Sequence, residues 1–351
     1  MKSSLLPYLV CRDCQTAMKL QAERTDGTEI LEGKLVCAAC DRIFPISRGV
    51  PRMLSTQLNS AQRATAEAFG YEWIHYSELT DADQGEFLDW IKPLTPSSFA
   101  GRVVLDAGCG KGRHIFLASQ FQAREVIGID LSDAVDAAYA NTRHLPNVHV
   151  VQADILKLPF AAPFDLVYSI GVLHHLPDPK QGFLSLTKHI RPGGQISIWV
   201  YGKEGNGWIE RFVNPFRLHV TSRAPKLVTR GFSFGLALPL YVALKLFYGP
   251  VQRSQRLRWL KSHAPYGEYL CAISDYTFAE NFWNVFDHLV APTAFYHRRE
   301  EVEDWFAASG VARTEISQRN RNSWRAIGTV PEGNVLVGAA PDQAEDLCEP
   351  L

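Results

Sequence analysis

Short apolar runs that end in an acidic residue recur through the middle of the chain. Residues 103–105 are Val-Val-Leu, followed by Asp106 and by glycines at alternate positions, Gly108, Gly110 and Gly112. A run rich in β-branched residues is typical of a buried parallel strand. Glycine adopts φ > 0 at no steric cost and lets backbone N–H groups approach a ligand closely. The pattern predicts a strand, a ligand-binding loop and then a helix.

The same arrangement is repeated further along the chain. The predicted strands that follow are 126–129, 148–151, 164–169 and 195–200. Asp130 and Asp154 stand at or just beyond the ends of the first two of these. Ligands of open α/β sheets bind at the carboxyl ends of the strands, and an acid after the second strand can accept hydrogen bonds from ribose hydroxyls. The periodicity therefore predicts a doubly wound α/β fold with a nucleotide-like ligand.

The glycine loop distinguishes between two ligands. In the dinucleotide fingerprint G-x-G-x-x-G the third glycine comes one residue later than Gly112, where this chain has Arg113. An acid at Asp106 would repel a pyrophosphate, whereas it suits S-adenosylmethionine (SAM), which carries a sulfonium and an α-ammonium group. The stretch resembles motif I, hxDxGxGxG, of the class I SAM-dependent methyltransferases.

That resemblance implies SAM as the cofactor and a Rossmann-like, mostly parallel seven-stranded sheet. By the same resemblance Asp154 accepts a hydrogen bond from the adenine amino group, and the backbone of Ile155 reads the ring edge. The residues expected to bind the cofactor are Asp106, Gly108, Gly110, Gly112, Asp130, Leu131, Asp154, Ile155 and Ser169. The resemblance also implies a final hairpin, which we expect at 313–319 and 334–337, after a helix at 298–310.

Four of the seven cysteines form two C-x₂-C pairs separated by 22 residues. Cys11 and Cys14 with Cys37 and Cys40 can supply four thiolates to one tetrahedral zinc, which leaves no open position and indicates a structural metal. Residues 1–56 resemble the Trm112-like small domain, which pairs with methyltransferases or is fused to them. The alternative is an unmetallated version of the same fold.

The domain organisation follows from these features. We expect a zinc ribbon at 1–56, a helical linker or cofactor lid at 57–100, a methyltransferase core at 101–340 with a helical insertion at 205–280, and an acidic tail at 341–351. Within the linker, Trp73 and Tyr76 either line the cofactor pocket or pack the linker onto the core.

Charge changes this picture only locally. The chain has 36 Lys and Arg against 37 Asp and Glu, so its overall balance gives no nucleic-acid signal. Its start lacks a long apolar segment, and we expect a cytoplasmic protein without a signal peptide. Between 211 and 267, however, there are ten Lys and Arg, nine aromatic residues and no acid.

The apolar run 231–244 inside that basic stretch is expected to be too short to span a bilayer unaided. Basic flanks around an apolar segment favour an amphipathic anionic acceptor or a peripheral membrane contact through 211–267. Aromatic residues interleaved with cations are also typical of RNA binding. The third interpretation is a helical pair packed on the core.

The segment after the fourth strand, residues 170–178, is Ile-Gly-Val-Leu-His-His-Leu-Pro-Asp. It lacks the N/D-P-P-Y with which amino-methylating nucleic-acid enzymes hold a planar amine, and it resembles the small-molecule and lipid branch, which includes quinone methyltransferases. His174 or His175 could take a proton from the acceptor, or both could be structural. His288, Tyr296 and His297 are second-rank candidates.

Taken together, the sequence predicts a SAM-dependent methyltransferase with a small-molecule or lipid-like acceptor methylated on O, N or C, and nucleic acid as an unlikely partner. Two alternatives stay open, an RNA base methyltransferase and a non-catalytic SAM-binding subunit.

Overall fold

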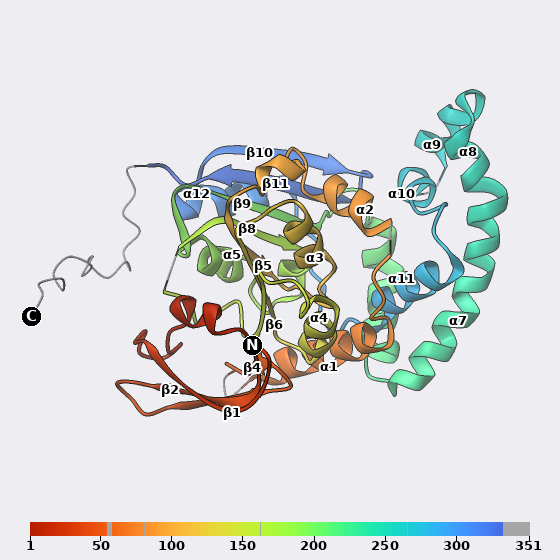
Figure 1. Ribbon diagram of the computed structural model, residues 1–351. Helices are drawn as coiled ribbons and strands as arrows, with labels where there is room; N and C mark the ends of the chain where they lie inside the picture. Colours follow the sequence, from red (N-terminus) through yellow and green to blue (C-terminus); the bar gives the residue numbers. More distant parts are fainter. Residues whose placement is uncertain (55–57, 81, 162, 265, 333–351) are drawn as a thin grey trace, which may run out of the picture.

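The computed structural model describes residues 1–54, 58–80, 82–161, 163–264 and 266–332. A four-stranded sheet at the N-terminus, a central seven-stranded sheet and a set of helices beyond its far end follow one another across the molecule (Figure 1).

The central sheet has the strand order β10-β11-β9-β8-β5-β6-β7. Its strands are β5 (Val103–Ala107), β6 (Glu125–Asp130), β7 (Val148–Gln152), β8 (Phe164–Ile170), β9 (Ile190–Tyr201), β10 (Ala312–Arg319) and β11 (Ser323–Thr329). The strands β5 to β9 are mutually parallel, and β11 runs antiparallel to both of its neighbours. The order reverses between β5 and β8, as in doubly wound folds, so the predicted Rossmann-like, mostly parallel seven-stranded sheet is confirmed.

Helices cover the central sheet because each buries an apolar side against it. They are α2 (Ala82–Trp90), α3 (Arg113–Gln120), α4 (Ala134–Thr142), α5 (Pro179–Thr187) and α12 (Arg299–Ser309). On α12 the residues Val302, Trp305 and Phe306 are buried, at the i, i+3, i+4 spacing of one helix face. Two 3₁₀ turns, η2 (Pro96–Ser98) and η3 (Leu173–His175), connect elements of this layer.

The final hairpin differs from the expected one. Asn320 and Arg321 have φ of 49° and 56°, so the chain reverses directly after β10 and re-enters the sheet at Ser323. Left-handed backbone of this kind is tolerated best by residues such as Asn. Residues 323–329, which follow the first expected strand closely, therefore form the second strand of the hairpin, and the strand expected at 334–337 lies outside the described residues.

The N-terminal sheet consists of β1 (Met18–Asp26), β2 (Glu29–Cys37), β3 (Ile43–Ser47) and β4 (Val50–Pro51), after the 3₁₀ helix η1 (Ser3–Tyr8). Its neighbours pair antiparallel. Leu9 and Phe44 belong to the same buried cluster as Leu158 and Phe160 of the central domain. The backbone N–H of Met53 donates to the carbonyl of Gln152 at 2.8 Å. The N-terminal sheet and the central domain thus share one hydrophobic core.

The remaining helices form the far end of the molecule. Helix α1 (Ser60–His75) precedes them in the chain and packs against both α4 and α11. The helices of the far end are η4 (Ile209–Val213), α6 (Asn214–Phe216), η5 (Arg217–Thr221), α7 (Lys226–Ala243), η6 (Leu244–Tyr248), α8 (Gly249–Arg253), η7 (Gln255–Leu257), α9 (Arg258–His263), α10 (Gly267–Ala272) and α11 (Phe278–Val290). Phe234 of α7 packs edge-on against Phe278 and Phe282 of α11.

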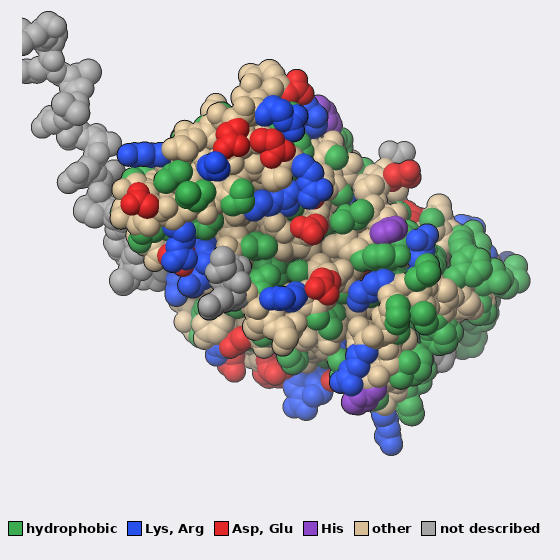
Figure 2. Space-filling model, turned by 90° about the horizontal axis from the view of Figure 1, so that it is seen from below, with side chains coloured by type: hydrophobic (Ala, Val, Ile, Leu, Met, Phe, Trp, Pro, Cys, Tyr) green, Lys and Arg blue, Asp and Glu red, His purple; other side chains and the backbone are tan. Residues whose placement is uncertain are grey.

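Much of the apolar surface of these helices is exposed. Leu227, Leu246 and Trp259 have exposed fractions of 74%, 77% and 60%. Hydrophobic side chains gather at this end of the molecule in the space-filling view (Figure 2). A helix running without interruption from 226 to 253 is, by length and composition alone, long and apolar enough to cross a membrane. The apolar run 231–244 lies inside this longer helix.

Candidate functional site

A cavity of about 300 Å³ opens at the carboxyl ends of the parallel strands. Residues of the predicted cofactor site that line it are Gly108, Gly110, Asp130, Leu131, Asp154 and Ile155. Residues of helix α1 also line the cavity beside the glycine loop. The cavity then continues between α1, the end of β9 and α11. We call the part of this one cavity that lies beyond the glycine loop and is lined by residues such as Trp199, Tyr201 and Asp287 the second chamber.

The glycine loop between β5 and α3 has a backbone that other residues would not adopt without strain. Gly108 has φ of +101°, and a Cβ there would lie 2.2 Å from a methyl carbon of Val172. Gly112 has φ of +87°, and a Cβ would lie 3.0 Å from the backbone of Ala138 on α4. Gly112 does not line the cavity, but it allows α3 to begin close to α4. The predicted loop geometry therefore rests on glycine at both positions.

Asp130 is held at the end of β6 by three hydrogen bonds. Its Oδ1 accepts from the backbone N–H of Ser132 at 2.8 Å and from the Ser132 hydroxyl at 2.6 Å. Its Oδ2 accepts from the N–H of Gly110 at 2.9 Å. Burial raises the pKa of Asp130, and these hydrogen bonds oppose the rise. The carboxylate is thus fixed beside the glycine loop, and Oδ2 keeps a lone pair for a ligand hydroxyl.

Asp154 is fixed by a residue outside the predicted motifs. Its Oδ1 accepts from the N–H of Leu156 at 2.9 Å, and its Oδ2 accepts from Nε2 of Gln62 at 2.8 Å. Gln62 also closes a capping box with Asn59 at the start of α1. Helix α1 is thereby anchored to the predicted adenine-binding acid. No motif in the sequence pointed to Gln62.

Two predicted cofactor residues lie behind the cavity wall. Asp106 is fully buried, and burial, followed by the charge of Asp130, raises its pKa well above the usual range. Ser169 is also fully buried, and its hydroxyl donates to the carbonyl of Ala107 at 2.8 Å. Neither residue lines the cavity, so their direct contact with SAM stays a prediction.

Trp73 and Tyr76 of α1 both line the cavity. The Lys111 ammonium lies 3.8 Å from the centre of the Tyr76 ring and donates to the carbonyl of Glu78 at 2.6 Å. Of the two interpretations of these aromatic residues, the structure places them on the pocket. The lysine after Gly110 ties this part of the linker to the glycine loop.

The second chamber has aromatic walls, one buried acid and one half-buried acid. Its flat side chains include Trp90, Trp199, Tyr201, Tyr269, Trp283 and Tyr296. Glu72 of α1 and Asp287 of α11 also line it, and the Tyr201 hydroxyl donates to Oδ2 of Asp287 at 3.5 Å. Burial raises the pKa of Glu72 well above its usual range and that of Asp287 to about 6. Sequence reasoning missed both acids, whose only local signal is a carboxylate inside an aromatic-rich helix.

The predicted catalytic histidines occupy different environments. His174 is fully buried, accepts from the backbone N–H of Tyr201 at 3.4 Å and does not line the cavity. His175 lines the cavity, and its Nδ1 donates to the carbonyl of Thr293 at 2.5 Å, which leaves Nε2 as the acceptor. Burial lowers the pKa of His175 to about 4, so it is neutral but weakly basic at pH 7. A catalytic role for either histidine stays a prediction.

The second-rank candidates for the catalytic base also differ in their position relative to the cavity. His288 and Tyr296 line the cavity, whereas His297 does not. Burial lowers the pKa of His288 to about 4 and raises that of Tyr296 to about 12.

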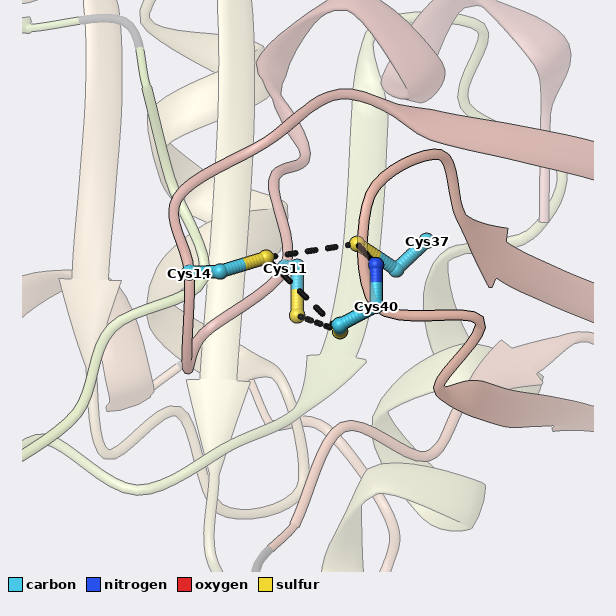
Figure 3. Close-up of side chains that lie close together, drawn as sticks. All are labelled: Cys11, Cys14, Cys37 and Cys40. Atoms are coloured by element: carbon cyan, nitrogen blue, oxygen red, sulfur yellow. Dashed lines mark hydrogen bonds between the residues drawn. The ribbon is translucent and has the colours of Figure 1, made fainter.

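The four predicted zinc ligands converge in the N-terminal sheet (Figure 3). Their sulfur atoms all lie within 4.8 Å of one another, with 3.3 Å between Cys14 and Cys37 and 3.8 Å between Cys11 and Cys40. Zinc–sulfur bonds of about 2.3 Å in a tetrahedron separate the sulfurs by about 3.8 Å. The cluster therefore fits a structural zinc with four thiolates.

Two family models match the chain. Residues 104–194 match the model described as a methyltransferase domain, and residues 2–49 match the model of Trm112p-like proteins. The chain thus contains a class I SAM-dependent methyltransferase domain preceded by a Trm112-like domain.

The relatives match part of the chain. A tRNA U34 carboxymethyltransferase of Pseudoalteromonas translucida is 36% identical over 122 residues, which are 34% of this chain and 36% of the relative. A trans-aconitate 2-methyltransferase of Deinococcus radiodurans is 36% identical over 126 residues, 36% of this chain and 47% of the relative. The chain thus spans about a third to a half of these relatives.

A crystal structure of magnesium protoporphyrin IX methyltransferase from Synechocystis PCC 6803 has 15% identity and a TM-score of 0.39. It covers 78% of this chain and 89% of its own.

The relatives correct one expectation from the sequence. Several of them carry the name tRNA U34 carboxymethyltransferase, which contradicts a small-molecule or lipid-like acceptor and a chain for which nucleic acid is an unlikely partner. The expectation of an amphipathic anionic acceptor with a peripheral membrane contact falls with it. The argument against nucleic acid rested on net charge and on a missing motif. A near-zero net charge does not exclude a local basic surface, and N/D-P-P-Y holds only planar amines.

Proposed function

We propose that this protein is a SAM-dependent methyltransferase whose acceptor is a base in RNA. The observation that carries the proposal is the continuity of one cavity, in which the glycine loop and Asp130 open directly into a chamber with aromatic walls. A flat acceptor can lie in that chamber, next to the predicted position of the cofactor. The names of the tRNA-directed relatives support RNA as the source of the acceptor.

The residues at the first end of the cavity fit SAM. Asp106 is buried behind the glycine loop, and its carboxyl oxygens have no hydrogen-bond partner within the described part of the chain. Asp130 offers an acceptor to ribose hydroxyls, and Asp154 offers one to an amino group. When bound, SAM supplies an electrophilic methyl group on a sulfonium sulfur.

The second chamber fits a nucleic-acid base. Trp90 and Trp199 line it with ring centroids 5.5 Å apart, and in the described residues neither buried indole N–H has a hydrogen-bond partner. An indole N–H is only a donor, and the carbonyl oxygens of a base are acceptors. Enzymes that act on a base take it out of its stack into a pocket of this kind and stack it on aromatic side chains.

The basic insertion suits the RNA backbone. Ile209 and Tyr266 of the insertion line the cavity, so its helices border the chamber. Arg211 and Arg256 are exposed on these helices, and Arg223 is exposed in the turn between η5 and α7. A cationic surface interleaved with aromatic residues follows single-stranded nucleic acid through charge and stacking.

The test is group transfer from radiolabelled SAM to total cellular RNA and, in parallel, to extracted lipids and small metabolites. Mass spectrometry of digested RNA identifies the modified nucleoside and distinguishes a methyl from a carboxymethyl group. We expect label in RNA, sensitive to ribonuclease, and none with Asp130→Ala, which removes an acceptor of charge-assisted hydrogen bonds. Label in metabolites or lipids but not in RNA would contradict the proposal.

A further inference from the structure

We propose that Asp287 accepts the proton of the methylated acceptor atom, while Glu72 faces the same chamber as a protonated hydrogen-bond donor. The inference rests on the proposed function and adds a catalytic residue to it. It concerns acceptor atoms that carry a proton, the N–H or O–H of a base.

The position of Asp287 supports this role. Its side chain lines the second chamber and keeps part of its surface open, while protein surrounds it on every other side. The Tyr201 hydroxyl donates to Oδ2, which leaves Oδ1 without a recorded partner among the described residues. Tyr201 is itself held by stacking, with its ring centroid 3.9 Å from that of His174 and 5.6 Å from that of Tyr296. The carboxylate is therefore oriented at the edge of the aromatic chamber.

Glu72 lies across from it on α1. It is 2% exposed, and its buried Oε2 has no hydrogen-bond partner among the residues that the structure describes. Burial is the largest cause of its raised pKa, and the negative charge of Asp287 is the second. Two carboxyl groups that line one cavity and act on each other resist simultaneous ionisation. Glu72 therefore holds the proton at neutral pH.

The surrounding charges affect the pKa values of the two acids differently. In the described residues, the charged or titratable groups that act on this pair or line the cavity around it include Arg217, Arg113, Lys111, Arg319, Asp83, Glu86, Glu280, His175, His288, Tyr76, Tyr201, Tyr266, Tyr269, Tyr276 and Tyr296. Arg217 of η5 is 1% exposed and is the largest influence opposing the rise in the pKa of Asp287. Nε and Nη2 of Arg217 have no hydrogen-bond partner within the described chain. A buried cation thus keeps Asp287, rather than Glu72, ionised near pH 7.

The balance of the step is simple. The bond between the methyl carbon and sulfur breaks, and the electron pair stays on sulfur, giving neutral S-adenosylhomocysteine. The methyl carbon bonds to the lone pair of the acceptor atom, and the acceptor's proton moves to Asp287, which becomes a neutral carboxylic acid. A carboxylate whose pKa is about 6 is suited to accept a proton near neutral pH.

The test compares the pH profile of RNA modification in wild type and variants, with SAM affinity measured by calorimetry. In the wild type, kcat should fall as the pH drops through about 6, because Asp287 is then protonated. Asp287→Asn should lower kcat by about 100- to 10,000-fold with unchanged SAM affinity, and Asp287→Glu should restore part of the rate. The matched control is Asp304→Asn, an exposed acid on α12, which should have no effect.

Arg217 and Tyr201 act as positioning residues, and their effect is measured as a shift in the pH profile. Arg217→Met and Tyr201→Phe should both move the acidic limb of the profile to higher pH, because each removes a group that lowers the pKa of Asp287. Arg217→Lys should keep the limb close to its wild-type position. If Arg217→Met does not fold because it lacks the buried cation, Tyr201→Phe alone tests the expected shift.

The outcomes separate the two proposals. A wild type that modifies RNA while Asp287→Asn retains its rate and acidic limb overturns the role of Asp287 alone. Unchanged limbs in Tyr201→Phe and Arg217→Met overturn the assignment of the limb to Asp287. A wild type that modifies no RNA overturns the proposed function, and this inference with it.

Discussion

The N-terminal sheet and the helical insertion are both rich in apolar residues, yet they bury them to different extents. Leu5 and Leu9 near the N-terminus are at most 2% exposed, and they pack into the same core as the central domain. In the insertion, Leu227 and Leu246 are more than 70% exposed. Contiguous exposed apolar surface is rare on a monomer and marks an interaction site. The comparison shows that similar apolar content serves stability in one region and leaves a surface available in the other.

The strongest test of this difference removes the zinc ligands. The chain should lose zinc on Cys37→Ser, and because the N-terminal sheet shares its core with the central domain, the whole protein should melt at a lower temperature and bind SAM less well. The SAM site would stay intact only if the two regions had separate cores, and the shared core removes that condition. Calorimetry and elemental analysis measure both effects.

Cys271→Ser is the control, since Cys271 lies in the helical end, far from the cluster in sequence. A separate early transition in Cys37→Ser, with the main transition and SAM affinity unchanged, would show that the sheet unfolds independently.

A matched pair of leucines measures the same contrast at single residues. Leu9→Ala should lower the free energy of unfolding by about 2–5 kcal/mol, because it leaves a cavity in the shared core. Leu246→Ala, at a side chain that is 77% exposed, should change it by about 0.5 kcal/mol or less. Urea denaturation followed by circular dichroism gives both values. Equal losses would mean that the insertion is buried in solution against something else.

The smallest expected effect concerns charge. Arg223→Glu and Arg256→Glu together should weaken RNA binding by about tenfold at low salt and reduce the salt dependence of affinity, because fewer counterions are released. Lys19→Glu, at an exposed cation on the N-terminal sheet, should change neither. Filter binding over a range of salt concentrations gives the slopes. If Lys19→Glu weakens binding as much, the RNA surface is not confined to the insertion.

Local patterns in the sequence determined the strands, the glycine loop and the cysteine cluster. Alternation of apolar runs with acids predicted strands β5 to β7, because each run must be buried in a parallel sheet. The spacing of Cys11, Cys14, Cys37 and Cys40 predicted one four-sulfur cluster, because each pair lies within one turn of chain. Such features depend on residues a few positions apart, so the sequence displays them directly.

The tertiary structure alone decided which distant residues meet. Glu72 and Asp287 are more than 200 residues apart, and only the packing of α1 near α11 brings both into one chamber. Gln62 reaches Asp154 for the same reason, and the position of β11 followed from a turn that no motif marks. Burial also could not be read from composition, because an apolar side chain such as Leu246 is buried only where another element covers it. Contacts of this kind arise from the arrangement of whole helices and strands, which local sequence does not encode.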